Sequence, residues 1–284
     1  MPKKLKTRID CDPYSKFRSY AGQHIMSNNV NPSDVDKLLT LKLPLFAGTR
    51  LSALCADIDQ KADHFAETNA DSALLEQFVK QTVDLYKMDE SHGLRHARNA
   101  AYYTHLLLQQ KNWSPRHKRL TILMAYFHDT VDSKYGAESN MDSLLVFART
   151  HFGCTDAELQ TIEFVLNHMS FSKRRSNLNA GEPEFSTADR QLIELTTLIA
   201  EADMLEAYNL ERTMLYQSIK HAAEPEPNRT YLIGSWVRTM IEKRILLYVQ
   251  SYFRTTEAKT IAQPLHDALS TYAEGFERFY SFDY

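Results

Sequence analysis

The sequence predicts an all-α protein, a helical bundle preceded by an N-terminal extension. Apolar residues recur at steps of three and four over most of the chain after Thr49, which is the spacing of a buried helix face. No stretch shows the apolar–polar alternation of a half-buried strand. Only 8 glycines and 9 prolines occur among the 284 residues, so few positions interrupt helices.

Composition limits the classes of function. The net charge of −3 gives no general electrostatic footprint for nucleic acid or for an acidic membrane surface. The three cysteines, Cys11, Cys55 and Cys154, are too scattered for a zinc-type pair and indicate a reducing compartment. The basic N-terminus lacks the apolar stretch of a secretory signal, and no run approaches the roughly 18 apolar residues of a membrane span. We therefore expect a soluble, cytoplasmic protein.

We interpret residues 1–70 as an N-terminal arm or extension and residues 71–284 as the main domain. The arm begins polar and irregular, with one short helix expected at Ser33–Leu41 and a segment able to dock on the main body at Leu41–Phe46. From Thr49 the period becomes helical. The apolar residues that carry this period are Leu51, Leu54, Cys55 and Ile58.

The first helices of the main domain are predicted at Asp71–Lys87 and at about His92–Gln110. Their apolar faces consist of Leu74, Leu75, Phe78, Leu85 and Tyr86, and of Ala100, Ala101, Tyr103, Leu107 and Leu108. Ser114 then supplies a capping hydroxyl before Pro115 at the first helical position. The next helix therefore runs from Ser114 to His128.

Six more helices are predicted further along the chain. The second of them opens with a capping box formed by Thr155 and Glu158. A polar interruption at Ser170–Thr187 follows it, which we interpret as a mobile flap. The predicted ranges are Met141–Phe152, Thr155–His168, Gln191–Asp203, Leu205–Ala222, about Arg229–Phe253 and about Thr256–Phe279.

The stretch Met124–Asp132 gives the clearest chemical signal. An apolar helical run ends there in His128 and Asp129, an imidazole beside a carboxylate. Such a pair is costly to desolvate at the inner end of a buried helix unless a cation pairs with it. Nitrogen and carboxylate oxygen together are a suitable partial ligand set for a divalent metal ion.

Three further features lie where they could converge with this pair. His92 and His96 are four residues apart and so share a helix face. Asp203 ends an apolar helix much as Asp129 does. His168 leads into hydroxyls and three successive cations, groups that hold phosphate. Taken singly, each has an ordinary explanation: an exposed histidine pair, an acid paired with a basic residue, and a solvated basic loop.

Taken jointly, these residues resemble the HD superfamily of metal-dependent phosphohydrolases. The match runs through His92-Gly-Leu-Arg-His96, Phe127-His128-Asp129, His168-Met-Ser-Phe-Ser172 and Glu201-Ala-Asp203. Residues 254–262 look like the closing helix of the small stand-alone bacterial branch, some of whose members cleave nucleoside triphosphates. The resemblance covers roughly residues 72–280.

The resemblance implies a helical bundle with a metal ion in its pit. It implies the metal ligands His96, His128, Asp129 and Asp203. Mn²⁺, Mg²⁺, Fe²⁺ and Zn²⁺ are all chemically reasonable, because ligand types limit the choice of ion without making it. Two imidazoles and two carboxylates leave coordination positions for water and a phosphoryl oxygen.

Further residues receive hypothetical roles. Asp129 and Asp132 form the catalytic set, with Asp132 orienting or deprotonating the attacking water. The residues expected to contact phosphate are His92, Lys134, His168, Ser172, Lys173, Arg174 and Arg175. His92 and His168 could instead serve a second metal ion.

The chain departs from the branch at three places. Met204 stands where an arginine normally follows the last aspartate, and Asn99 where another arginine is expected. The glycine-rich turn and second arginine are replaced by Tyr208–Met214, in which Arg212 could substitute for that arginine from a different helical angle. These departures weaken a triphosphatase assignment and leave the metal ligands untouched.

We therefore expect metal-dependent hydrolysis of a phosphate ester or anhydride, most simply in a nucleotide. A phosphodiesterase acting on cyclic or linear phosphodiesters is the alternative within catalysis. A degenerate HD module that senses a ligand, with the N-terminal arm contacting a partner, is the alternative outside it. The expected partner is a phosphorylated small molecule, with no membrane or nucleic acid, and the final helices allow a homodimer.

Overall fold

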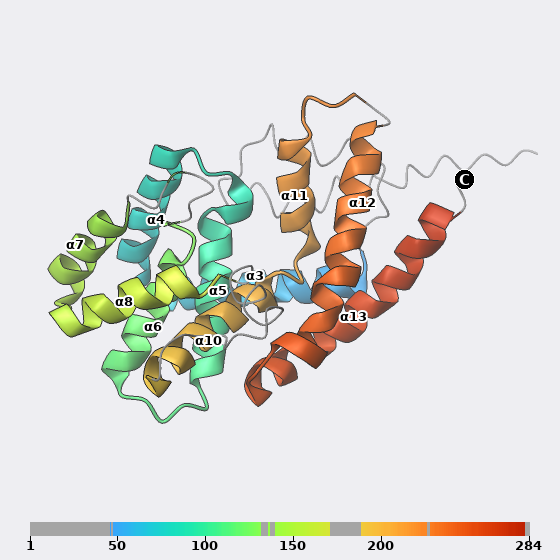
Figure 1. Ribbon diagram of the computed structural model, residues 1–284. Coiled ribbons are helices and arrows are strands. Elements are labelled where there is room, and N and C mark those ends of the chain that lie inside the picture. Colours follow the sequence, from blue (N-terminus) through green and yellow to red (C-terminus); the bar gives the residue numbers. More distant parts are fainter. Residues whose placement is uncertain are drawn as a thin grey trace, which may run out of the picture.

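The computed structural model describes residues 46, 48–131, 136, 140–170, 189–225 and 228–281. Every regular element in these ranges is a helix, and none of them contains a strand (Figure 1). The all-α prediction is therefore confirmed. Among the described helices, none combines the length and the apolar character needed to cross a bilayer.

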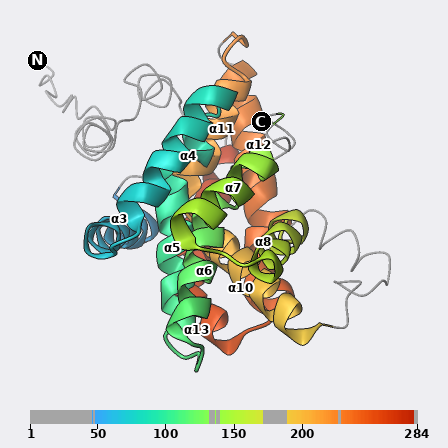
Figure 2. The same cartoon turned by 90° about the vertical axis from the view of Figure 1, so that its left-hand side faces the viewer.

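Helix α5 (Leu94–Leu108) lies in the middle of the bundle. It packs against α3 (Arg50–Thr68), α4 (Ser72–Tyr86), α6 (Pro115–Phe127) and α10 (Arg190–Glu206), which surround it in both views (Figures 1 and 2). Helix α10 begins 82 residues after the end of α5 (190 − 108), so this contact joins distant parts of the sequence. A side chain on α5 can therefore meet side chains from α6 and α10.

The C-terminal parts of α6 and α10 are buried on nearly every side. All eight residues of α6 from Leu120 to Phe127 are buried. In α10, Leu195–Glu206 is buried except for Asp203, which keeps part of its side chain accessible. A helix enclosed on all sides must be apolar all round. Polar groups at these two ends therefore stand out as candidates for a function.

The local start signals predicted from the sequence are present. The Ser114 hydroxyl accepts a hydrogen bond from the His117 N–H, and Pro115 opens α6. In α8 (Asp156–His168), the capping box of Thr155 and Glu158 is complete. Helix α7 (Met141–Phe152) has the predicted bounds.

The helix predicted at Arg229–Phe253 ends early. Helix α12 (Asn228–Lys243) stops before Arg244, whose φ of −135° and ψ of −70° are not helical. A 3₁₀ turn at Ile245–Leu247 (η4) and a π turn at Tyr248–Tyr252 (η5) follow. Ile245, Tyr248 and Phe253 are buried along this irregular stretch. The predicted continuation through Phe253 is therefore wrong.

The start of the predicted helix at Leu205–Ala222 is also wrong. Helix α10 continues to Glu206, and the chain turns at Ala207–Asn209 before α11 (Leu210–Lys220) begins. The turn redirects the chain so that α11 runs beside α12 (Figure 1). Helix α13 (Thr256–Ser281) closes the bundle against α3, α10 and α12.

The beginning of the described chain packs into the same core. Phe46 is buried, and its ring meets that of Tyr272 in α13 edge to face, with 5.9 Å between the ring centroids. Helix α3, which the sequence assigned to the extension, buries Leu51, Cys55 and Ala62. The short helix predicted at Ser33–Leu41 lies outside the described residues.

Candidate metal centre

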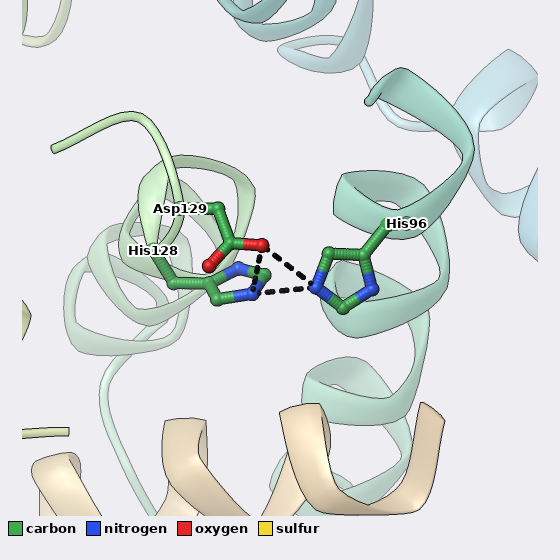
Figure 3. Close-up of side chains that lie close together, drawn as sticks. All are labelled: His96, His128 and Asp129. Carbon is green, nitrogen blue, oxygen red and sulfur yellow. Dashed lines mark hydrogen bonds and ion pairs between the residues drawn. The ribbon is translucent and has the colours of Figure 1, made fainter. Parts of the chain in front are cut away.

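Two buried imidazoles face each other between α5 and the end of α6. His96 lies on α5 and is 2% exposed, while His128 directly follows α6 and is 5% exposed. Their Nε2 atoms are 2.8 Å apart, and the rings are close to perpendicular (Figure 3). The two Nε2 atoms therefore point into the same space between α5 and the end of α6.

The other nitrogen of each ring is turned away from that space. Nδ1 of His128 donates a hydrogen bond of 2.8 Å to the carbonyl oxygen of Ala125. Nδ1 of His96 lies 3.1 Å from Oε2 of Glu206, which is an ion-pair contact. Partners of this kind behind Nδ1 fix the orientation of an imidazole that binds metal through Nε2.

Two carboxylates complete the group. Oδ2 of Asp129 lies 3.1 Å from Nε2 of His96 and 3.5 Å from Nε2 of His128. Oδ1 of Asp203, from α10, lies 3.5 Å and 3.8 Å from the same two nitrogens. The four residues that the sequence named as metal ligands thus meet at one place, although they come from three parts of the chain.

Two residues that the sequence analysis did not assign to the site are also present. Glu206, on α10, is buried beside His96, and its Oε2 lies 2.6 Å from Nε of Arg212 on α11. Nη1 of Arg212 is 3.3 Å from Nε2 of His96, and Nη2 is 3.8 Å from Oδ1 of Asp203. Glu206 follows Asp203 by three residues and so shares its helix face, a spacing that could have identified it.

The carboxylates of the site are ionised. Burial acts to raise the pKa of Asp129, Asp203 and Glu206, but neighbouring cationic groups outweigh it. The imidazole of His128 is the largest influence that lowers the pKa of Asp129 and of Asp203. The Arg212 guanidinium is the largest that lowers the pKa of Glu206. Three negative charges, of which that of Glu206 is buried, therefore surround the imidazoles.

The charges favour a positive charge on the imidazole of His96. Burial and the Arg212 guanidinium act to lower the pKa of this imidazole. Glu206 and Asp129 outweigh them and raise the pKa to about 9. The position therefore attracts a positive group, whether a proton or a metal ion.

The donor atoms fit a divalent metal ion. His96, His128 and Asp129 each offer an atom within 4.8 Å of the others. Two donors bound to one ion at about 2.1 Å would lie about 3.0–3.4 Å apart, close to the observed contacts. Oδ2 of Asp129 is buried and accepts no hydrogen bond from the described residues, so it has coordination capacity left. Two imidazoles and two carboxylates suit Mn²⁺, Fe²⁺ or Zn²⁺, and Mg²⁺ with added oxygen ligands.

The remaining predicted site residues divide into three groups. His92 lies beside the cluster, with its ring centroid 6.2 Å from that of His96, and its Nδ1 is 2.7 Å from the Ser91 hydroxyl. His168 makes its contacts within α8, where Nδ1 donates to the carbonyl oxygen of Phe164. The others lie outside the described residues: Asp132, Lys134, Ser172, Lys173, Arg174 and Arg175, together with the predicted flap.

Asn99, where the resemblance leads one to expect an arginine, has a structural contact. Its side-chain amide donates a hydrogen bond of 2.7 Å to Oδ1 of Asp59. Arg95 contacts the same carboxylate, so the pair ties α5 to α3. This position therefore stabilises the helix that carries His96.

Fold and site define an all-α protein with a buried imidazole–carboxylate group able to hold a metal ion. Comparison of the chain with family models, curated proteins and solved structures finds no match. Membership of the HD superfamily therefore stays a prediction from the motifs.

Proposed function

We propose that this protein is a metal-dependent phosphohydrolase of the HD type, which hydrolyses a phosphate ester or anhydride in a nucleotide. The observation that carries the proposal is the convergence of two Nε2 atoms and two ionised carboxylates from α5, α6 and α10. A purely structural bundle gains nothing from this arrangement, because desolvating imidazoles and carboxylates together costs free energy.

The chain's own residues prepare the site for hydrolysis. His96 and His128 present Nε2, because Glu206 and the Ala125 carbonyl hold their Nδ1 atoms. Asp129 and Asp203 concentrate negative charge where a cation is needed. A divalent ion held there supplies polarisation of a phosphorus–oxygen bond and lowers the pKa of a water molecule.

A nucleotide as substrate is supported by the aromatic groups beside the cluster. Tyr216 lies one helical turn after Arg212 on α11 and is half-buried. Its ring centroid is 5.5 Å from that of His92, at nearly right angles. Aromatic rings so close to the charged groups give a nucleobase or ribose a surface to contact while the phosphate reaches the cluster.

Bound metal and released product test the proposal together. The purified protein is assayed for Mn, Fe and Zn, and then incubated with nucleoside mono-, di- and triphosphates and with cyclic and linear phosphodiesters, each with Mn²⁺ and with EDTA. We expect release of orthophosphate or pyrophosphate that requires the divalent ion. Release of a monophosphate from diesters alone would instead indicate the phosphodiesterase.

The first prediction concerns Asp129. Asp129→Asn keeps the size of the side chain but removes one ionised ligand, so we expect loss of bound metal and a fall in turnover of at least about 100-fold. Asp142→Asn, at an exposed position in the first turn of α7, is the matched control and should behave as the wild type. Full metal content and full activity in Asp129→Asn would contradict the assignment. If the wild-type protein binds metal but hydrolyses none of the substrates, the result favours the ligand-binding module.

A further inference from the structure

We propose that Arg212 is the second cation of this site. In this role it replaces a second metal ion and binds a phosphoryl oxygen of the substrate next to a single divalent ion. The inference rests on the proposed function and specifies how many ions the site takes and which side chain contacts the phosphoryl group.

The guanidinium of Arg212 is held at one edge and faces the cluster with the other. Its Nε forms the 2.6 Å ion pair with Glu206, and Nη1 donates a hydrogen bond of 3.4 Å to the carbonyl oxygen of Ser91. The two Nη atoms approach His96 and Asp203 at 3.3 Å and 3.8 Å. The side chain is only 17% exposed, so its position is fixed by its surroundings.

The balance of charge favours one metal ion. Asp129, Asp203 and Glu206 contribute three negative charges and Arg212 one positive charge, which leaves two negative charges when the imidazoles are neutral. One divalent ion neutralises them. A second would leave an excess of positive charge in a buried site and would lie against the guanidinium, both of which are unfavourable.

The guanidinium also has the donors that a phosphoryl group needs. Arginine carries five N–H groups in a planar fork that matches two oxygens of a phosphate. Glu206 lies at Nε, and Nη1 contacts the Ser91 carbonyl and Nε2 of His96. Nη2 lies 3.8 Å from Oδ1 of Asp203, beyond hydrogen-bond distance, so its N–H groups remain for a ligand. A phosphoryl oxygen between Nη2 and the metal position would contact two positive groups, as in a two-metal site.

Titration calorimetry tests the inference with two simple probes. Mn²⁺ is titrated into the full chain, and inorganic phosphate is then titrated into the Mn²⁺-loaded chain. The same titrations are made with Arg212→Gln and Arg212→Lys. Arg98→Ala is the control, because Arg98 is similarly buried and paired with Glu76 and Asp63 away from the cluster. Thermal unfolding reports whether each variant is folded.

We expect one Mn²⁺ per wild-type chain. Arg212→Gln should bind Mn²⁺ at least as tightly, because a repelling charge is gone, and should bind phosphate about 10- to 100-fold more weakly. Arg212→Lys should bind phosphate with intermediate affinity, because lysine keeps the charge and loses the fork. Arg98→Ala should match the wild type in both titrations.

The failures are distinguishable. Two Mn²⁺ per wild-type chain overturns the inference without the use of any variant. Unchanged phosphate affinity in Arg212→Gln and Arg212→Lys overturns it while the proposed function stands. A loss of Mn²⁺ binding in folded Arg212→Gln shows that Arg212 only positions Glu206 and His96. A wild-type chain that binds no Mn²⁺ and hydrolyses nothing removes the proposed function, and this inference with it.

Discussion

Glu206 has a different task from the two aspartates at the cluster. Asp129 and Asp203 face the shared Nε2 atoms, whereas Glu206 lies behind His96 and contacts its Nδ1 at 3.1 Å. The same Oε2 atom contacts Nε of Arg212. One buried carboxylate thus orients an imidazole and a guanidinium, and it makes His96 a stronger ligand by favouring positive charge on the ring.

The second prediction follows at this residue. Glu206→Gln keeps the shape of the side chain and removes its charge, so His96 should bind metal less well. We expect the affinity for Mn²⁺ to fall about 10- to 100-fold, as measured by titration calorimetry. Glu194→Gln lies on the same helix, where Glu194 pairs with Lys111 near the surface, and serves as the control. Equal affinity in the two variants would show that Glu206 does not act through His96.

The sequence named four residues of the site through the resemblance of its motifs to the HD superfamily. His128, Asp129 and Asp203 sit at the ends of apolar runs, and His96 gained weight from the order of the motifs. The sequence could not show whether Nδ1 or Nε2 of each imidazole faces the other residues of the cluster. That depends on the approach of α10 to α5, which sets Glu206 behind His96.

At the scale of elements, α8 shows how a local signal acquires a distant partner. Glu158 closes the capping box with the Thr155 N–H, and it also accepts two hydrogen bonds from the guanidinium of Arg116 on α6. The bonds from Arg116, more than any other influence, lower the pKa of Glu158 to about 2. The capping box is visible in the sequence, whereas the arginine is brought there by the packing of α6 against α8.

The third prediction is the pH dependence that this contact creates. The pKa of Glu158 is below its ordinary value of 4.5 in the folded chain, so the contact stabilises the fold above pH 4.5 and is lost as the pH falls toward 2. Glu158→Gln keeps an acceptor for the cap and removes the titration. The difference in unfolding free energy between wild type and variant should shrink by about 1 kcal/mol between pH 6 and pH 3, a value reduced for solvent screening.

Urea denaturation over this pH range measures the effect. Glu163→Gln, at an exposed position on the same helix, is the control and should leave the pH dependence unchanged. If the difference in unfolding free energy between wild type and Glu158→Gln stays constant with pH, the charge of Glu158 does not cause the pH dependence.

At the scale of the whole molecule, α10 links the site to the end of the chain. Glu201 is fully buried two residues before Asp203, and its carboxylate accepts hydrogen bonds from the backbone N–H groups of Arg254 and Thr255. It thereby binds the two backbone N–H groups that directly precede α13. The helix that carries Asp203 is thus fixed to α13 as well as to α5.

The fourth prediction concerns the stability of the whole chain. An ion that binds only the folded state stabilises it by about 2.7 kcal/mol at 100 times its Kd. For a chain of this length, Mn²⁺ should therefore raise the Tm by about 5 °C. His128→Ala should abolish the rise, and His117→Ala, at an exposed position on α6, should keep it. An equal rise in both variants would place the bound Mn²⁺ somewhere else.

The sequence alone determined the helical class and the helix starts at Ser114 and Thr155, because periodicity and capping act over a few positions. The candidate metal ligands came from the resemblance of its motifs to a known family, and the structure brings His96, His128 and Asp129 close enough to hold an ion. Only the tertiary structure decided that α12 ends at Lys243, how the imidazole rings at the cluster are oriented, and that Glu206 and Arg212 contact the cluster. These features arise from contacts between segments far apart in the chain. Their free energies come from burial and charge pairing that exist only once the helices have packed.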